Sequence, residues 1–282
     1  MINWPERLLE DFQLERVVLF IGSGVSRNSV GADGRTRPKT WHSFLESAAA
    51  QRGMAEKIAP YLSGRDYLTA LDVLRHGMAH EDYAALVRAE YQRPAYEPAE
   101  IHDALYRLNC RIVLTPNFDK IYDVFAGQKS RGTIDVKEYH CPEIAEFIRG
   151  DRQVVIKTHG SVDSHKQMIF GRKDYAKARV EHSLFYDVLK ALILTHTFLF
   201  IGCGIDDPDI RLVLEDINFG AVGSRAHYFV AAAGAINQDM KNVLLDTMNL
   251  RVVEYDYVAE SNDHSDLTNS LKELATSLAE AG

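Results

Sequence analysis

The fold is decided by residues 17–26, which read VVLFIGSGVS. The five consecutive apolar residues Val17–Ile21 predict a short strand that is buried on both faces. Gly22 and Gly24 follow at once, and glycine lets the backbone turn tightly or approach a phosphate group closely. We therefore expect a strand, a glycine turn and the start of a helix, whose free amide groups favour negative charge.

Six further runs of the same kind recur along the chain, and helical patterns separate most of them. These runs are Arg111–Leu114, Thr133–Lys137, Gln153–Lys157, Thr197–Ile201, His227–Val230 and Leu250–Glu254. Short apolar strands that alternate with helices are typical of a parallel sheet covered on both faces. The sequence predicts one α/β domain over residues 1–282, with a Rossmann-like, doubly wound parallel sheet and an α-helical insertion.

The boundaries of the insertion follow from the periodicity. Residues 41–108 contain no convincing strand but several patterns with a 3.6-residue period, so we expect the helical insertion there and the core over residues 15–40 and 109–258. A lid is expected over residues 161–194, where Gly171 and Arg172 follow a short apolar run. A C-terminal amphipathic helix over residues 264–281 is expected to pack on the core.

Composition excludes several classes of protein. The net charge of −8, from 32 basic and 40 acidic residues, argues against direct nucleic-acid binding as the main role. The three cysteines have no C-x-x-C spacing, so neither a disulfide framework nor a zinc site is predicted, and no metal is expected. We expect a cytoplasmic protein without a membrane anchor, because no apolar run approaches the roughly 18 residues needed to span a bilayer.

Polar residues follow the ends of three other expected strands. Thr115–Asp119 reads TPNFD, where Asn117 can donate and accept hydrogen bonds and Asp119 can accept them. Thr158–Ser161 reads THGS and places His159, a side chain suited to accept a proton near neutral pH, before a glycine. Ligands of α/β sheets bind at the carboxyl ends of strands. A structural role stays open for each residue, because Asn and Asp commonly cap helices and most histidines are not catalytic.

The loop after Thr197–Ile201 reads GCGIDDPD over residues 202–209. Gly202 and Gly204 can admit a nucleotide, while Asp207 is placed to cap a helix that begins near Pro208. We expect both roles together at this loop.

These four loops, in this order, resemble those of the sirtuin family: a G-A/S-G-x-S loop, a T-x-N-x-D loop, a His-Gly pair and a later glycine loop. The resemblance implies that the protein uses NAD as its substrate. It also implies roles for two sets of residues. Asn117, Asp119 and His159 would be catalytic, and the NAD-binding residues would be Gly22, Ser23, Gly24, Ser26, Thr115, Gly160, Gly202, Gly204 and Asp207.

The chain also departs from the family. Gly204 stands where a serine is usual, no G-I-P-D-F-R segment follows the first loop, and the four-cysteine zinc module of protein deacylases is absent. With Pro38-x-x-Trp41 after the first loop and DDPDI over residues 206–210 after the last, the chain is similar to a divergent bacterial sirtuin-like branch that hydrolyses NAD in antiphage defence. That resemblance implies a homo-oligomer and a separate sensor partner, such as a HerA-type ATPase or a short Argonaute.

The sequence thus predicts an NAD hydrolase that releases nicotinamide and ADP-ribose. Asn117 would position water or the ribose, His159 would accept a proton, and Asp119 would orient the ribose hydroxyls. Two alternatives stay open: a protein deacylase or ADP-ribosyltransferase, and a noncatalytic sensor of NAD or ADP-ribose. A dehydrogenase is disfavoured because Arg27 stands where the dinucleotide fingerprint needs its third small residue.

Overall fold

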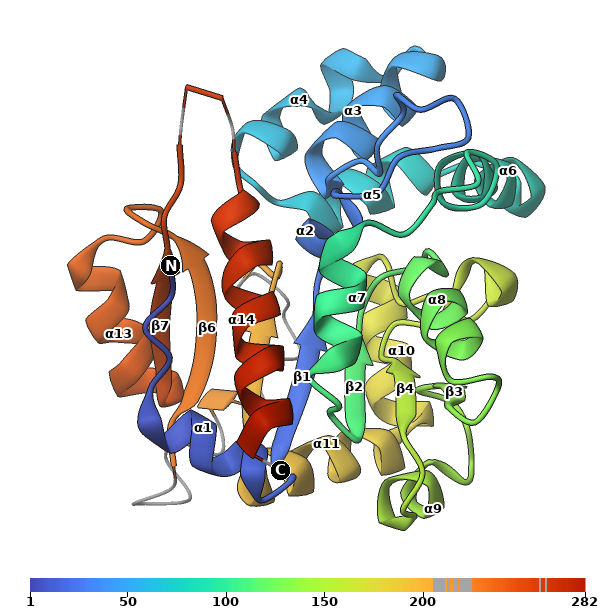
Figure 1. The fold of residues 1–282 in the computed structure, drawn as a ribbon. Coiled ribbons are helices and arrows are strands. Elements are labelled where there is room, and N and C mark those ends of the chain that lie inside the picture. Colours follow the sequence, from blue (N-terminus) through green and yellow to red (C-terminus); the bar gives the residue numbers. More distant parts are fainter. Residues whose placement is uncertain are drawn as a thin grey trace.

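The computed structural model describes residues 1–204, 225–258, 260–261 and 263–281, and the single positions 211, 214, 215 and 218. Its strands are β1 (Val17–Ile21), β2 (Ile112–Thr115), β3 (Asp135–Glu138), β4 (Val154–Lys157), β5 (Thr197–Ile201), β6 (His227–Ala232) and β7 (Leu250–Tyr255). All seven pair in parallel, in the order β3-β4-β2-β1-β5-β6-β7 (Figure 1). Each strand lies within two residues of the bounds predicted from its apolar run.

Helices cover both faces of the sheet, and β1 contributes to both cores. Its residues Val17, Leu19 and Ile21 face one set of helices, whereas Val18 and Phe20 face the other. The first set is α1 (Glu6–Gln13), α7 (Glu100–Arg107), α8 (Ile121–Lys129) and α14 (Ser265–Ala281). The second set is α9 (Ile144–Arg149), α10 (Arg172–Glu181), α11 (Ser183–Thr195) and α13 (Gln238–Met248). The predicted doubly wound α/β fold is confirmed.

The helices at residues 41–91 form a separate layer beyond the carboxyl ends of the strands (Figure 1). They are α3 (Trp41–Gln51), α4 (Ala55–Ser63), α5 (Tyr67–Arg75) and α6 (His80–Tyr91). Their apolar sides form a cluster that also includes Phe118 from the loop after β2 and Phe170 from the segment after β4. The layer is therefore anchored on the loops at the strand ends. We call α3–α6 the roof.

Helix α7, the last helix of residues 41–108, packs against the sheet and is not part of the roof. Helix α7 packs on α14, and its residues Ile101, Ala104 and Leu105 belong to the core on the sheet. Helix α14 buries Leu267, Leu271 and Leu274 in the same core, as the apolar stripe of the sequence predicted. Among the described residues, no helix combines the length and the apolar character that crossing a bilayer would require.

Candidate functional site

Three loops meet where the strand order reverses. Strands β2, β3 and β4 lie on one side of β1 in the sheet, and strands β5, β6 and β7 lie on the other side. Open α/β sheets bind ligands at such a switch in strand order. The loop after β1 enters the short helix α2 (Ser23–Ser26). Thr115 at the end of β2 donates from its hydroxyl to the carbonyl of Ile21 at 2.7 Å, which ties the ends of β1 and β2 together.

The glycines of the first and last loops allow these two loops to touch. A Cβ on Gly22 would lie 2.4 Å from the carbonyl oxygen of Gly202, and one on Gly24 would lie 2.9 Å from the Cα of Gly202. Gly202 itself has a φ of +65°, in the left-handed region that favours glycine. The glycines are thus required for the packing of these two loops against each other.

A buried hydrogen-bond network joins the first loop to the loop after β2. The Asn117 side-chain amide donates to the Ser26 hydroxyl at 3.0 Å, and that hydroxyl donates to Oδ2 of Asp119 at 2.8 Å. The other carboxylate oxygen of Asp119 accepts from the backbone N–H of Ile121 at 3.0 Å. Because Asn117, Ser26 and Asp119 are all buried, this network fixes the orientation of the amide and of the carboxylate before any ligand binds.

A buried lysine supports this network from below. Lys157, the last residue of β4, is 1% exposed, and its ammonium group donates to the backbone carbonyl of Asp119 and to Oδ1 of Asp123. Burial raises the pKa of Asp123, and the charge of Lys157 opposes that shift. Lys157 therefore holds the Asp119 backbone in place. Lys157 was not among the residues predicted from the sequence, although a lysine at the end of an apolar strand is a signal for such a role.

His159 follows β4 and is 6% exposed. Its ring packs edge-on against Tyr175 of α10, with centroids 5.2 Å apart, and its carbonyl accepts from the N–H of Ile169 at 2.9 Å. Gly160 has a φ of +77°, and a Cβ there would lie 3.0 Å from the carbonyl oxygen of Gln167. The glycine therefore permits the turn that follows His159.

Two cavities lie on either side of the first loop. The inner cavity, of about 470 Å³, lies between the strand ends and the roof, and the outer cavity, of about 1020 Å³, lies between α2, β6 and the start of α14. They share four lining residues, Ser23, Thr40, Cys203 and Gly204. A ligand longer than either cavity can therefore lie across Ser23 and Gly204.

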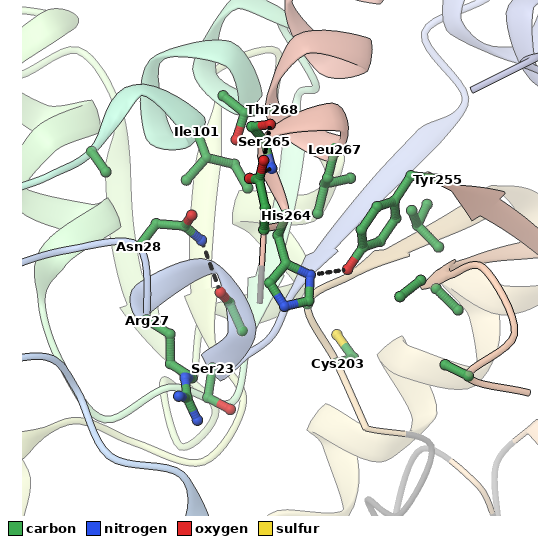
Figure 2. A pocket seen from close by; sticks show the side chains of 18 of the residues that line it. Ser23, Arg27, Asn28, Ile101, Cys203, Tyr255, His264, Ser265, Leu267 and Thr268 are labelled. Carbon is green, nitrogen blue, oxygen red and sulfur yellow. Dashed lines mark hydrogen bonds between the residues drawn. The ribbon is translucent and has the colours of Figure 1, made fainter. Parts of the chain in front are cut away.

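The outer cavity has a polar wall that was not predicted from the sequence. Figure 2 shows His264 between Tyr255 on one side and Arg27 and Ser23 on the other. The hydroxyl of Tyr255 is 2.7 Å from Nδ1 of His264. Burial, and next the charge of Arg27, lower the pKa of His264. The guanidinium of Arg37 donates to the backbone carbonyls of Arg27 and Asn28 at 3.1 and 3.0 Å, which holds this side of the wall in place.

The structure brings most of the predicted site residues together. Those that line the inner cavity are Gly22, Ser23, Ser26, Asn117, Asp119, His159 and Gly204, and those that line the outer cavity are Ser23, Gly24, Gly202 and Gly204. Thr115 and Gly160 support the loops instead, through the contacts given above. Asp207 lies outside the described residues. Within the described part of the chain, no group of three or more His, Cys, Asp or Glu side chains could hold a metal ion.

A comparison with protein families identifies the type of domain. Residues 111–253, just over half of the chain, match the model of the SIR2-like domain, from the residue before β2 to within β7. The chain belongs to the SIR2-like family. The resemblance inferred from the four loops is thereby confirmed, and the match covers three of them, the Asn117, His159 and Gly202 loops.

Curated relatives of this SIR2-like chain are similar at modest identity. NAD(+) hydrolase ThsA of Enterococcus faecium is 27% identical over 63% of this chain, and ThsA of Bacillus cereus (strain MSX-D12) is 24% identical over 75% of it. Defense-associated sirtuin 2 of Bacillus subtilis is 20% identical over 94% of this chain. The matched regions span 40%, 43% and 25% of these three relatives, respectively, so the chain corresponds to less than half of each.

Proposed function

We propose that this SIR2-like domain hydrolyses the bond between nicotinamide and ribose in NAD, with nicotinamide and ADP-ribose as products. The observation that supports this most strongly is the set of Asn117, Asp119 and His159 around one cavity, which shares lining residues of the first and last glycine loops with a second cavity. Two cavities joined at a phosphate-binding type of loop suit a dinucleotide. The names of the ThsA relatives support the same activity.

In this proposal the nicotinamide riboside half of NAD occupies the inner cavity. The adenosine half occupies the outer cavity, and the two phosphates lie at the shared residues Ser23 and Gly204. Glycine at positions 22, 24, 202 and 204 leaves the backbone open to the phosphates. The NAD-binding role of Asp207, which lies outside the described residues, rests on the family resemblance. Thr115 and Gly160 act by holding the loops that carry the catalytic residues.

The chemistry follows from the charge that develops on the sugar. Breaking the bond from C1′ to the ring nitrogen gives the ribose oxocarbenium character, and the nicotinamide leaves as a neutral molecule, so no acid is needed on the leaving group. The carboxylate of Asp119 stabilises the positive charge and orients the ribose hydroxyls. Asn117 positions the ribose or the attacking water, and His159 accepts the proton that water gives up.

The wider role proposed here is antiphage defence in the cytoplasm, with a homo-oligomer and a separate sensor partner. The name of the Bacillus subtilis relative, a defense-associated sirtuin, supports the defence role. A HerA-type ATPase or a short Argonaute is the kind of partner we expect. Regulation by a partner fits an enzyme whose substrate is needed by every healthy cell.

The test uses chromatography to measure the nicotinamide and ADP-ribose that the purified protein releases from NAD. The measurement is made with and without the product of a neighbouring gene. We expect Asn117→Ala and His159→Ala each to lower the rate at least about 100-fold. Matched controls are Asn242→Ala, on the exposed side of α13, and His196→Ala, just before the amino end of β5. Full activity in both site variants would contradict the assignment. NAD binding without cleavage under either condition would favour a sensor or an enzyme that modifies a second substrate.

A further inference from the structure

The roof side of the inner cavity is made largely of aromatic rings. Trp41 of α3, Tyr67 of α5 and Tyr91 of α6 line it, together with Phe118 from the loop after β2. The segment that precedes Trp41 contributes as well, because Pro38 and Thr40 line the same cavity. This is the Pro38-x-x-Trp41 pattern of the sequence, to which the proposed catalytic steps give no role.

The rings are held in fixed positions by one another. Trp41 packs edge-on against Phe170 with centroids 4.6 Å apart, and Phe118 packs edge-on against the same ring at 4.7 Å. Tyr91 packs edge-on against Phe118 at 5.6 Å, and Tyr67 lies 6.2 Å from Trp41. The hydroxyl of Thr40 accepts from the N–H of Ser43 and caps α3, which makes Trp41 the first residue of that helix. The indole is therefore set in place by the fold.

The charges around the cavity favour a cationic ligand in its interior. The carboxylate of Asp119 lies at the floor, and its hydrogen-bond donors among the described residues, Ser26 and Ile121, are both neutral. Of the cations that line the cavity, Lys39 is paired with Glu90 at 3.0 Å and Arg65 is exposed. The two histidines that line the cavity pack edge-on against tyrosine rings, His42 against Tyr67 and His159 against Tyr175.

Aromatic side chains that line a cavity opposite a buried carboxylate suit a flat cation, which is attracted to the face of an aromatic ring. We propose that the roof, and Trp41 above all, binds the positively charged pyridinium ring of the substrate through cation–π contacts. This inference rests on the proposed function and adds the feature that selects the oxidised, cationic form of the ring. When the bond to C1′ breaks, its electron pair stays on the ring nitrogen, the ring becomes neutral and the cation–π attraction ends. The same wall thus favours binding of the substrate and release of nicotinamide.

The test compares two ligands that differ in charge and hardly in shape: 1-methylnicotinamide, a cation, and nicotinamide, which is neutral. The chain has two tryptophans, and Trp4 lies with α14 on the sheet, so a Trp4→Phe background leaves Trp41 as the fluorescent reporter. We expect 1-methylnicotinamide to quench Trp41 and to bind roughly 3- to 30-fold more tightly than nicotinamide.

The variants are compared by calorimetry. Trp41→Leu is expected to bring the ratio of the two affinities close to one, and Trp41→Phe to leave an intermediate ratio. The matched control is Phe44→Leu, which removes a ring from the same cluster at a buried position of α3 outside the cavity lining. This variant is expected to be less stable and to keep the preference for the cation. If Trp41→Leu does not fold, Trp41→Phe and the titration of the Trp4→Phe protein still decide the question.

Equal affinity for the two ligands, or an unchanged ratio in the Trp41 variants, would overturn the inference. The outcomes also separate it from the proposed function. NAD cleavage without a preference for the cation leaves the hydrolase standing and removes the aromatic recognition. A preference for the cation without NAD cleavage supports the recognition and removes the hydrolase.

Discussion

The floor and the roof of the inner cavity are built in opposite ways. The floor consists of strand-end residues that are buried and hydrogen-bonded to one another, with Asn117, Ser26 and Asp119 in one network above Lys157. The roof consists of helices whose apolar sides pack together with Phe118 and Phe170, and at one edge it is joined to α10 by ion pairs. One of these pairs, Arg172 with Asp66, is about half exposed, at 56% and 40% of each side chain.

This difference in construction predicts different roles for the floor and the roof. Moving a floor residue would break buried hydrogen bonds, which costs more free energy than an exposed ion pair contributes. In the proposed hydrolase, the floor is therefore the wall that we expect to determine the geometry of the chemistry. The roof lines the cavity mainly with aromatic side chains, so we expect it to determine which ligands bind and how tightly. Changes on the floor should lower stability and turnover together, and changes at the roof edge should alter mainly KM.

The largest effect is expected from Lys157→Met. The substitution leaves the carboxyl group of Asp123 buried without its ammonium partner, and removing one member of a buried ion pair typically destabilises a protein by about 3–5 kcal/mol. It also removes the donor to the carbonyl of Asp119, so the protein that folds should cleave NAD slowly. Urea unfolding followed by circular dichroism measures the first effect.

The double variant Lys157→Met with Asp123→Leu is the control for this experiment. Replacing a buried ion pair with apolar side chains is often neutral, so stability should largely return. Turnover should not return, because the carbonyl of Asp119 still lacks its donor. A loss of less than about 1 kcal/mol in the single variant would mean that the floor is not a cooperative unit, and the contrast between the two walls would fail.

The sheet could be predicted because its inner strands, such as β1 and β5, are buried on both faces. Such strands must be continuous apolar runs, so β1 and β5 were found with their bounds, and the others within two residues. The floor residues were found for a related reason. Asn117 and His159 each lie two residues after the end of a strand, and the carboxyl ends of parallel strands meet at one edge of the sheet.

The roof contacts could not be predicted in the same way. Tyr67 and Tyr91 lie on amphipathic helices, where an aromatic residue that faces a cavity has the same periodicity as one that faces a core. The role of Lys157 was not predicted because a polar residue at the end of a strand is usually solvated. His264 reaches the outer cavity only because α14 returns to the sheet beside β7. Each of these depends on contacts between distant parts of the sequence.

An intermediate effect is expected from acid, and it should act through the sheet that supports the floor. His227 is buried in β6, and its Nδ1 accepts from the N–H of Phe198 at 3.1 Å. Burial lowers its pKa to about 4, below the ordinary value of 6.5. As the pH falls, the unfolded chain takes up the proton first, so stability is lost between these two values. At pH 5 this residue alone should cost about 2 kcal/mol relative to pH 7.5.

The measurement is urea unfolding at pH 7.5 and pH 5 for the unaltered protein and for His227→Asn. Asparagine can still accept from Phe198 and does not titrate, so the variant should lose about 2 kcal/mol less than the unaltered protein over this interval. His102, which also has a pKa lowered by burial to about 4, stays in both proteins and does not affect the comparison. Equal losses would show that His227 is protonated without opening the sheet.

The smallest effect on stability, and the sharpest test of the contrast, is expected from Arg172→Gln at the edge of the roof. The guanidinium of Arg172 donates to Asp66 at 2.7 Å and to Thr69 at 2.9 Å, and Asp66 lines the inner cavity. Because exposed ion pairs contribute at most about 1 kcal/mol, stability should hardly change, while KM for NAD should rise roughly two- to fivefold at constant kcat. About 1 M salt, which screens exposed charges, should raise KM of the unaltered protein toward that of the variant. If kcat fell instead, the roof edge would be coupled to the floor through α10, whose Tyr175 packs against His159, and the two walls would act as one unit.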